Sequence, residues 1–294
     1  MRGVRPPAVG DASFDEYYYA HCCGDPYERN EAHLRFFAGI AERLIADMAP
    51  KSVLDAGCAT GMLVEALRQR GVEATGIDLS SFAIERAHES VRAYCHHGSI
   101  ADELPDRYDL IVSIEVLEHM PVRAAEAAIA NFCRHTDDVL FSSSPLDYKE
   151  PTHVNVHPPE YWAAEFARHG FYRDVDFDAS YITPWAARFR RGTEPVHRIV
   201  QDYERRFWQL TLERNDTRAY SMQVQNELAV KIDELGRMTD ERARVSEALA
   251  AQTAESARLA AAVEASQREL AQARDRIFHM ERSLFWRLRS LFRR

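Results

Sequence analysis

Proline is missing from the last third of this sequence: twelve prolines occur, and none of them follows Pro195. The 99 residues after it contain a single glycine, Gly236, and are rich in Ala, Glu, Arg, Gln and Leu. Because proline and glycine end or weaken helices, this composition excludes a turn-rich segment and indicates a long helix. We therefore place a domain boundary near residues 190–200.

Cysteine is also scarce, with five residues in 294 and no CxxC pair. They are Cys22, Cys23, Cys58, Cys95 and Cys133. Their number is odd, and two adjacent cysteines do not easily bridge each other. The sequence thus predicts reduced thiols in a reducing compartment.

Long apolar runs are absent as well. No stretch of 18 consecutive apolar residues predicts a membrane span, and the first residues do not resemble a signal peptide, so we expect a cytosolic protein. Lys and Arg total 37 against 46 Asp and Glu, which argues against nucleic-acid binding by an overall basic surface. Residues 274–294 are the exception, with seven Arg against Asp275 and Glu281, or +5.

Before Pro195, apolar runs of strand length alternate with amphipathic stretches and glycine turns. This alternation predicts an α/β domain: a Rossmann-like, seven-stranded, mostly parallel sheet with flanking helices and ligands at the carboxyl ends of the strands. The expected strands are 52–56, 73–78, 93–97, 110–114, 139–143, 172–177 and 180–182. The expected helices are 30–48, 62–70, 82–92, 122–134 and 160–169.

The clearest motif is the turn after the first strand, where residues 53–61 read VLDAGCATG. The second strand ends 17 residues later at Asp78. Glycines let a backbone approach a ligand, and an acidic residue ending the next strand can accept hydrogen bonds from both hydroxyls of a ribose. The dinucleotide pattern G-x-G-x-x-G is broken at Ala59 and Met62, and no Walker-type Gly-Lys-Ser/Thr occurs. The turn therefore predicts a nucleoside site without a pyrophosphate cradle.

The D-x-G-C-x-x-G form of this turn resembles the first motif of class I S-adenosylmethionine-dependent methyltransferases. Residues 108–120 (YDLIVSIEVLEHM) are similar to the fourth-strand motif of that superfamily, especially of its ubiquinone-biosynthesis-like O-methyltransferases. The resemblance covers residues 15–190, with a domain similar to types 11 and 12, and implies S-adenosylmethionine as cofactor. Gly57 would hold the methionine moiety, Asp78 the ribose, and the loop of residues 98–100 the adenine. The implied cofactor-binding residues are Asp55, Gly57, Cys58, Gly61, Asp78, Leu79, Ser99, Ile100 and Glu115.

Methyl transfer to an alcohol needs alignment and a base or metal that helps to remove the proton. His119 and His153 are the catalytic candidates. His153 is preferred to His157, because the next helix is expected to begin at Pro158. The metal candidates are Glu115, Glu118, His119 and His153, which could bind Mg²⁺ or Mn²⁺ and resemble the metal site of small-RNA 2′-O-methyltransferases. A metal-free histidine base and a purely structural role stay open.

A heptad register runs from Val224 to Leu284, and thirteen of its eighteen a and d positions are apolar. This favours a coiled coil, and hence a homo-oligomer, over a lone charged helix. In chain order, we expect an N-terminal lid segment over 1–29, a methyltransferase domain over 30–192, a helical linker over 193–222, a coiled coil over 223–284 and a basic aromatic tail over 285–294.

The tail interleaves arginine with phenylalanine, tryptophan and leucine, which favours a helix on an anionic membrane surface, with nucleic-acid binding as the competitor. It also resembles the ends of coiled-coil segments attached to bacterial glycan-assembly enzymes. We expect an S-adenosylmethionine-dependent O-methyltransferase for a hydroxyl of a sugar or cell-surface glycan, peripheral at the inner membrane face. The alternatives are an RNA ribose 2′-O- or quinone-like small-metabolite methyltransferase, and a cofactor-binding coiled-coil scaffold without turnover.

Overall fold

The structure is a computed structural model that describes residues 10–23 and 26–291, with side chains through residue 282. Seven strands form the sheet: β1 Ser52–Ala56, β2 Glu73–Asp78, β3 Cys95–His97, β4 Leu110–Ile114, β5 Asp138–Ser142, β6 Phe171–Arg173 and β7 Ala187–Arg191. The α-helices are α1 Glu16–His21, α2 Glu31–Met48, α3 Met62–Arg68, α4 Ser81–Glu85, α5 Val122–His135, α6 Pro159–Arg168 and α7 Val196–Leu291. Short 3₁₀ turns lie at Asp11–Ser13, Arg92–Tyr94 and Leu117–His119.

The strands lie in the order β3-β2-β1-β4-β5-β7-β6. Strands β1 to β5 pair in parallel, and β7 is antiparallel to both of its neighbours. The predicted Rossmann-like, mostly parallel sheet of seven strands with flanking helices is confirmed. The strand order reverses between β1 and β4, so the carboxyl ends of these two strands form the crevice in which such sheets bind ligands.

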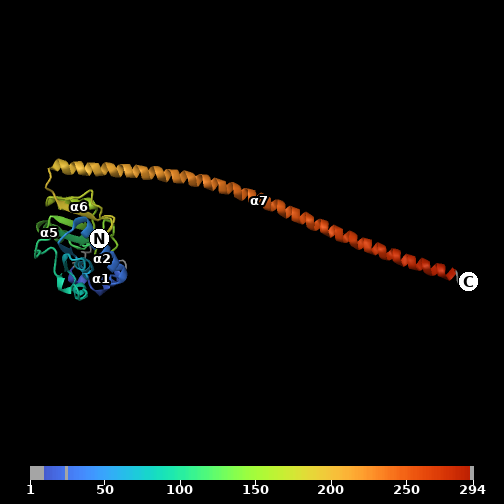
Figure 1. Cartoon of the computed structure of the whole chain (residues 1–294), viewed down its shortest axis with the longest axis horizontal. Helices are drawn as coiled ribbons and strands as arrows, with labels where there is room; N and C mark the ends of the chain where they lie inside the picture. The colour runs from blue at the N-terminus through green and yellow to red at the C-terminus, as the bar shows by residue number, and fades with distance from the viewer. Residues whose placement is uncertain (1–9, 24–25, 292–294) are drawn as a thin grey trace, which may run out of the picture. The chain divides into compact units, whose positions relative to one another are not determined.

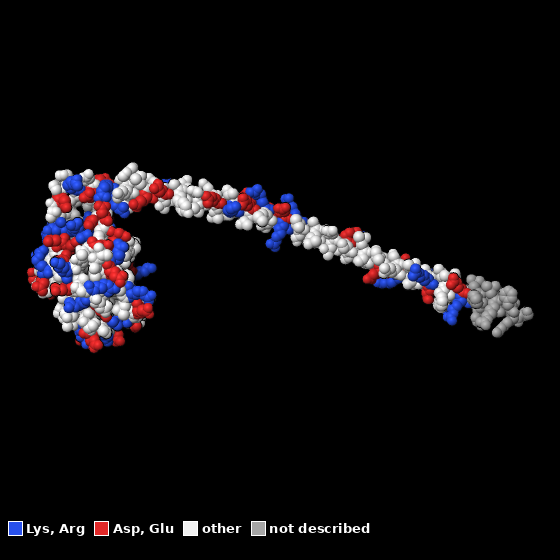
Figure 2. Space-filling view, viewed as in Figure 1, with Lys and Arg blue, Asp and Glu red and all other residues white. Residues whose placement is uncertain are grey.

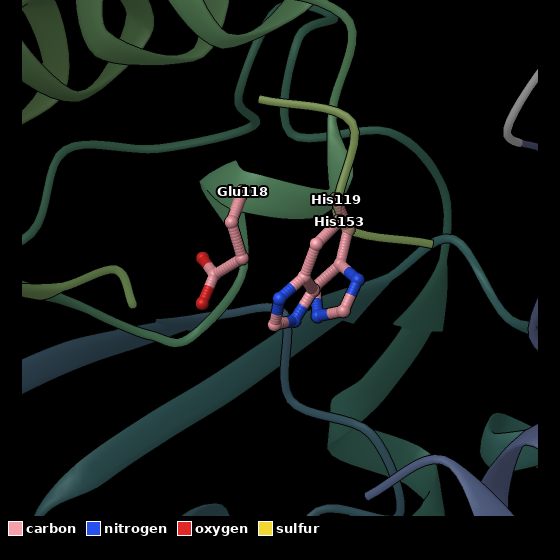
Figure 3. Close-up of side chains that lie close together, drawn as sticks. All are labelled: Glu118, His119 and His153. Carbon is pink, nitrogen blue, oxygen red and sulfur yellow. The ribbon is translucent and has the colours of Figure 1, made fainter. Parts of the chain in front are cut away.

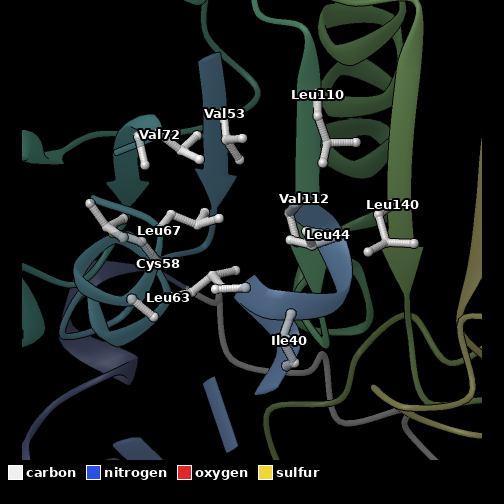
Figure 4. Packing of buried hydrophobic residues seen from close by; sticks show 14 of the residues in the cluster. Ile40, Leu44, Val53, Cys58, Leu63, Leu67, Val72, Leu110, Val112 and Leu140 are labelled. Carbon is white, nitrogen blue, oxygen red and sulfur yellow. The ribbon is translucent and has the colours of Figure 1, made fainter. Parts of the chain in front are cut away.

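Neighbouring residues along the central strands face opposite sides of the sheet, as the pleat requires. Val53 packs with Ile40 and Leu44 of α2 in one buried cluster (Figure 4). Its neighbour Leu54 packs with Phe132 of α5 in a second cluster on the other face. Burial on both faces explains why the central strands read as apolar runs without alternation.

The prediction of the last strand was wrong. Residues 180–182 lie in a loop, where the Asp178 side chain accepts a hydrogen bond of 2.9 Å from the Ser180 backbone N–H. The strand is Ala187–Arg191, which carries three arginines and so lacks an apolar signature. It enters the sheet because Arg188 bonds to the Asp138 carboxylate on the neighbouring strand.

The helix expected over 82–92 is also shorter in the structure. Ser80 caps the start of α4 by accepting a hydrogen bond from the Ala83 N–H (3.1 Å), but the helix ends at Glu85. Beyond it the His88 ring bonds to the Ser90 hydroxyl (2.8 Å). Such local side-chain bonds compete with the helical backbone pattern.

α7 runs unbroken from Val196 to Leu291 (Figure 1). The chain divides into two compact units between Gln209 and Leu210, so the first turns of α7 belong with the sheet. There the Arg205 guanidinium makes hydrogen bonds of 2.8 and 2.7 Å with the Asp176 carboxylate.

Beyond Leu210 the helix exposes nearly all of its side chains, so the coiled coil remains a prediction at this point. The basic aromatic tail of residues 285–294 lies outside the described side chains, and its membrane role also stays a prediction. Within the described residues, no helix is long and apolar enough to cross a membrane.

We expect a chain ended at Gln209 to fold with the melting temperature of the full-length α/β domain. The reason is that the sheet and its two cores lie within the first unit, together with the Arg205–Asp176 pair. Calorimetry of both proteins checks this prediction. A loss of the cooperative transition in the shorter chain would show that residues beyond 209 support the domain.

Candidate active site

The turn after β1 is held in place by backbone hydrogen bonds. The N–H groups of Gly57 and Cys58 both donate to the Ile77 carbonyl on β2, at 2.8 and 3.2 Å. Gly57 has φ +95, and a Cβ there would lie 2.3 Å from Cγ2 of Val116. The turn after β1 therefore packs directly on the loop after β4, and glycine is required for that contact as well as for access to a ligand.

We expect Gly57→Ala to destabilise the domain by about 2–4 kcal/mol, because the methyl group adds a steric clash to the backbone strain. Gly71→Ala is the matched control: Gly71 has φ +83, but nothing lies within 4 Å of an added Cβ. Its cost should be backbone strain alone, about 1 kcal/mol. Urea unfolding measures the free energy lost in each variant. Equal losses in the two variants would contradict a steric clash between the added methyl group and Val116.

Two carboxyl groups lie beside this turn. Asp78 accepts hydrogen bonds from the N–H groups of Ala59 (2.7 Å) and Ser80 (2.8 Å). Burial raises the pKa of Asp78, and burial together with the Asp78 charge raises the pKa of Asp55 to about 8. Neither group forms an ion pair among the described residues. Asp55 is buried and Asp78 partly exposed, and two carboxyls without an ion-pair partner among the described residues suit a positively charged ligand.

The Asp55 carboxyl makes a prediction about stability against pH. Its pKa of about 8 in the fold lies above the value of about 4 expected in the unfolded chain. The stability that it contributes is therefore fully present below pH 4 and is lost as the pH rises to 8. Relative to Asp55→Asn, the wild-type protein should lose about 1.4 kcal/mol per pH unit between pH 5 and 7. If the unfolding free energies of the two proteins change in parallel over this pH range, Asp55 does not have a raised pKa in the fold.

The other predicted cofactor residues also lie at this edge of the sheet. The Leu79 carbonyl accepts from His97 Nε2 (3.1 Å), and the Ser99 hydroxyl accepts from the Ala101 N–H (3.2 Å). Ile100 is buried. Cys58 is buried as well, and its neighbour Cys95 contributes to raising the pKa of the Cys58 thiol.

Two features of the turn fit a nucleoside cofactor. The Thr60 hydroxyl is buried without a hydrogen-bond partner among the described residues. Buried polar atoms of this kind are normally satisfied, so Thr60 has a bond to offer to a ligand. The Asp78 oxygens each accept one backbone hydrogen bond and retain lone pairs for further donors.

A second group of side chains gathers where the loops after β4 and β5 meet. One donor atom from each of Glu118, His119 and His153 lies within 4.8 Å of the others (Figure 3). The two imidazole rings approach edge to face, with centroids 4.5 Å apart. The structure thus brings together three of the four predicted metal candidates.

Hydrogen bonds define the tautomer of His119. The Thr152 hydroxyl donates to the Glu150 carboxylate (2.7 Å), so its oxygen accepts from Nδ1–H of His119 (2.8 Å). Burial and the neighbouring His153 lower the pKa of His119 to about 3. His119 is therefore neutral near pH 7, and its unprotonated Nε2 lies 3.4 Å from the Tyr18 hydroxyl.

The same reasoning applies to the other two members. His153 Nδ1 lies 2.7 Å from the Asp147 carbonyl, which can only accept, so Nδ1 is the donor and in the neutral ring Nε2 holds the lone pair. Glu118 is fully buried; its Oε1 accepts from the Ser144 N–H (3.0 Å), and its Oε2 has no partner among the described residues. Burial and the nearby Glu115 raise the pKa of Glu118 to about 8. Three lone-pair donors thus converge.

Glu115 is not part of this group. It has φ +52, and its carboxylate accepts a hydrogen bond of 2.9 Å from the Trp185 indole. His157 lies outside the group as well, stacked on Tyr161 with ring centroids 3.7 Å apart. At this positive φ the Glu115 side chain leaves the backbone in a different direction from the side chains of Glu118 and His119.

Aromatic residues of the N-terminal segment lie against both parts of the site. The Tyr18 hydroxyl of α1 is 3.4 Å from His119 Nε2, and the Phe14 ring meets the His119 ring edge to face. The Phe14 carbonyl accepts from the Ser80 hydroxyl (2.6 Å), beside Asp78. Tyr19 stacks on Phe82 of α4. The sequence predicted a lid segment over residues 1–29, but only the tertiary contacts identify Phe14, Ser80 and Trp185.

Comparison with known proteins places this site in context. A family model described as a methyltransferase domain matches residues 27–174. The chain is 40% identical over 84 residues to the ubiquinone biosynthesis O-methyltransferase of Pseudomonas paraeruginosa, which is 26% of this chain and 36% of that protein. It is 36% identical over 113 residues to the protein of the same name from Aromatoleum aromaticum, which is 35% of this chain and 48% of that protein. The chain thus spans a third to a half of the length of these relatives.

Among solved structures, magnesium protoporphyrin IX methyltransferase from Synechocystis, with bound S-adenosylmethionine, superposes with a TM-score of 0.48. It is 18% identical, and the match covers 65% of this chain and 100% of that chain.

Proposed function

Because this chain belongs to the methyltransferase domain family, whose model matches residues 27–174, we propose that it transfers a methyl group from S-adenosylmethionine to the oxygen of an acceptor hydroxyl. One observation carries the proposal most. Three lone-pair donors, on Glu118, His119 and His153, converge after β4, and the neighbouring strand β1 carries Asp55 and the turn to which Asp78 is hydrogen-bonded.

This part of the site fits the cofactor chemically. S-adenosylmethionine supplies an electrophilic methyl group on a positively charged sulfur, and it also carries an ammonium group. Asp78 would accept hydrogen bonds from the ribose, while a positively charged ligand nearby would favour ionisation of Asp55, whose pKa is otherwise about 8. Thr60 would donate its unused hydroxyl proton.

His119 is placed to handle the proton of the acceptor. Its Nε2 is unprotonated, and Thr152 holds the ring through Nδ1. A hydroxyl whose proton points to this lone pair becomes more nucleophilic as the new bond forms. Tyr18 and Phe14 cover the ring and help to exclude water from the reacting oxygen.

The same donors could instead hold a divalent cation. Glu118 would contribute an oxygen, and His119 and His153 each a nitrogen. Mg²⁺ prefers oxygen ligands, whereas imidazole with carboxylate suits Mn²⁺ better, so of the two predicted ions we propose Mn²⁺. Such an ion would lower the pKa of a bound acceptor hydroxyl.

The acceptor class is proposed as a hydroxyl on a sugar or on a small quinone-like metabolite. The relatives named for ubiquinone biosynthesis support the small-metabolite class, so we propose the two classes on an equal footing. An RNA ribose is less favoured, because the chain carries a net charge of −9.

The test uses the full chain, methyl-labelled S-adenosylmethionine and three acceptor panels: sugars and glycans, catechols and hydroxyquinols, and RNA. We expect label in one of the first two panels. Label in RNA alone would contradict the proposed acceptor class. Cofactor binding without label in any panel or in a fractionated cell extract would favour a scaffold without turnover.

A further inference from the structure

Between Val224 and Met280, α7 carries an apolar stripe whose large hydrophobic side chains are exposed among the described residues. From Leu235 to Arg282 every side chain is exposed. All but three of the large hydrophobic side chains exposed between Val224 and Met280 occupy heptad positions a or d; the three are Val230, Ile232 and Phe278. Helices of proteins gain most of their stability by burying such a stripe.

Charge at the flanking positions indicates how a second helix would lie. Figure 2 shows residues of both signs along α7, separated by uncharged stretches. In a parallel, in-register pair, position g of one helix meets position e of the next heptad on its partner. Between Val224 and Arg282 two such pairs have a charge on both sides, and both are of opposite sign. They are Glu269 with Arg274, and Arg276 with Glu281.

An antiparallel pair would place position g opposite position g of the partner. The charged g residues between 227 and 269 are all glutamate: Glu227, Glu234, Glu241, Glu255 and Glu269. An antiparallel overlap of this region would therefore bring like charges together at its edge. The repulsion selects the parallel orientation.

The polar residues of the stripe favour two strands. Arg242 lies at position a and directly follows Glu241 at position g. In a two-stranded coil a long side chain at position a can lay its stem along the seam and extend its charged end to a flanking glutamate of the partner. A seam of three or more strands would enclose the guanidinium more fully and raise its desolvation cost.

The geometry points to a parallel, in-register, two-stranded coiled coil between two copies of this chain, extending over residues 224–282. Both chains then enter the coil at the same end, so one dimer carries two methyltransferase domains at that end. This inference does not depend on the proposed methyl transfer, because it uses only residues beyond 209.

Oligomeric state and orientation can be tested on the full chain. We expect light scattering to give the mass of a dimer. Leu228→Cys and Leu270→Cys lie at position a; on mild oxidation each variant alone should form a disulfide-linked dimer. Ala271→Cys, on the outer b position, and the wild-type chain with its native cysteines are the controls and should not crosslink. Crosslinking only in a mixture of the two variants would establish an antiparallel coil and overturn the proposal, as would a monomer or trimer.

Two further sets of variants separate the seam from the helix itself. Leu249→Asp with Leu270→Asp should give a monomer, whereas Ala250→Asp with Ala271→Asp adds the same charge to the outer face and should leave a dimer. Glu269→Arg should raise the dimer dissociation constant by roughly tenfold, and adding Arg274→Glu should restore it. Asp275→Arg, on the outermost position, should have no such effect. Equal effects of seam and outer variants would contradict the assigned interface.

Discussion

Asp78→Ala should weaken the binding of S-adenosylmethionine by about 2–4 kcal/mol, or roughly 30- to 1000-fold. The side chain is proposed to hold the ribose, and it already ties the turn after β1 to the start of α4 through Ala59 and Ser80. Removing it takes away ligand contacts and loosens the turn that surrounds them. Titration calorimetry measures the effect.

A matched control separates the ligand contact from loss of backbone order. Asp109 lies at the opposite end of the sheet and accepts hydrogen bonds from the Lys51 and Ser52 N–H groups, at 2.8 and 3.2 Å. Asp109→Ala removes a comparable pair of bonds and should leave cofactor affinity unchanged. Asp78→Asn keeps one acceptor oxygen and should lose less affinity than Asp78→Ala. Unchanged affinity in Asp78→Ala would place the cofactor elsewhere.

His119→Ala should lower turnover by about 100- to 10,000-fold with little change in cofactor affinity, because the residue faces the acceptor and not the nucleoside. His157→Ala is the control: its ring stacks on Tyr161 outside the cluster, and turnover should change little. A loss below tenfold in His119→Ala, with cofactor still bound, would leave catalysis to alignment alone.

The roles of base and metal ligand are separated by two measurements. With a bound ion, EDTA should abolish turnover, Mn²⁺ should restore it, and Glu118→Gln and His153→Ala should each be nearly as damaging as His119→Ala. The pKa of Glu118, about 8, also predicts that Mn²⁺ binding weakens as the pH falls below 8, because the carboxyl must lose its proton to bind. A metal-free base predicts indifference to EDTA and a small effect of Glu118→Gln.

Much of the site could be predicted from local sequence. The turn of residues 53–61 and Asp78 lie at neighbouring strand ends because strand, glycine turn and helix follow one another directly, and parallel strands bring their carboxyl ends to one edge. The segment from Glu115 to His119 was likewise recognisable beside β4. What stayed hidden were contacts between segments that sequence spacing does not link, such as Trp185 with Glu115, 70 residues apart.

The sequence by itself determined the parallel strands β1 to β5, the glycine turn and the long helix, because hydrophobic runs, turn residues and the lack of proline act over short distances. Only the tertiary structure decided which donors converge. Glu118, His119 and His153 meet because β4 and β5 are adjacent, while Glu115 turns away at positive φ. It also showed that arginine-rich Ala187–Arg191 is a strand, since the pairing of Arg188 with Asp138 exists only once the sheet has formed.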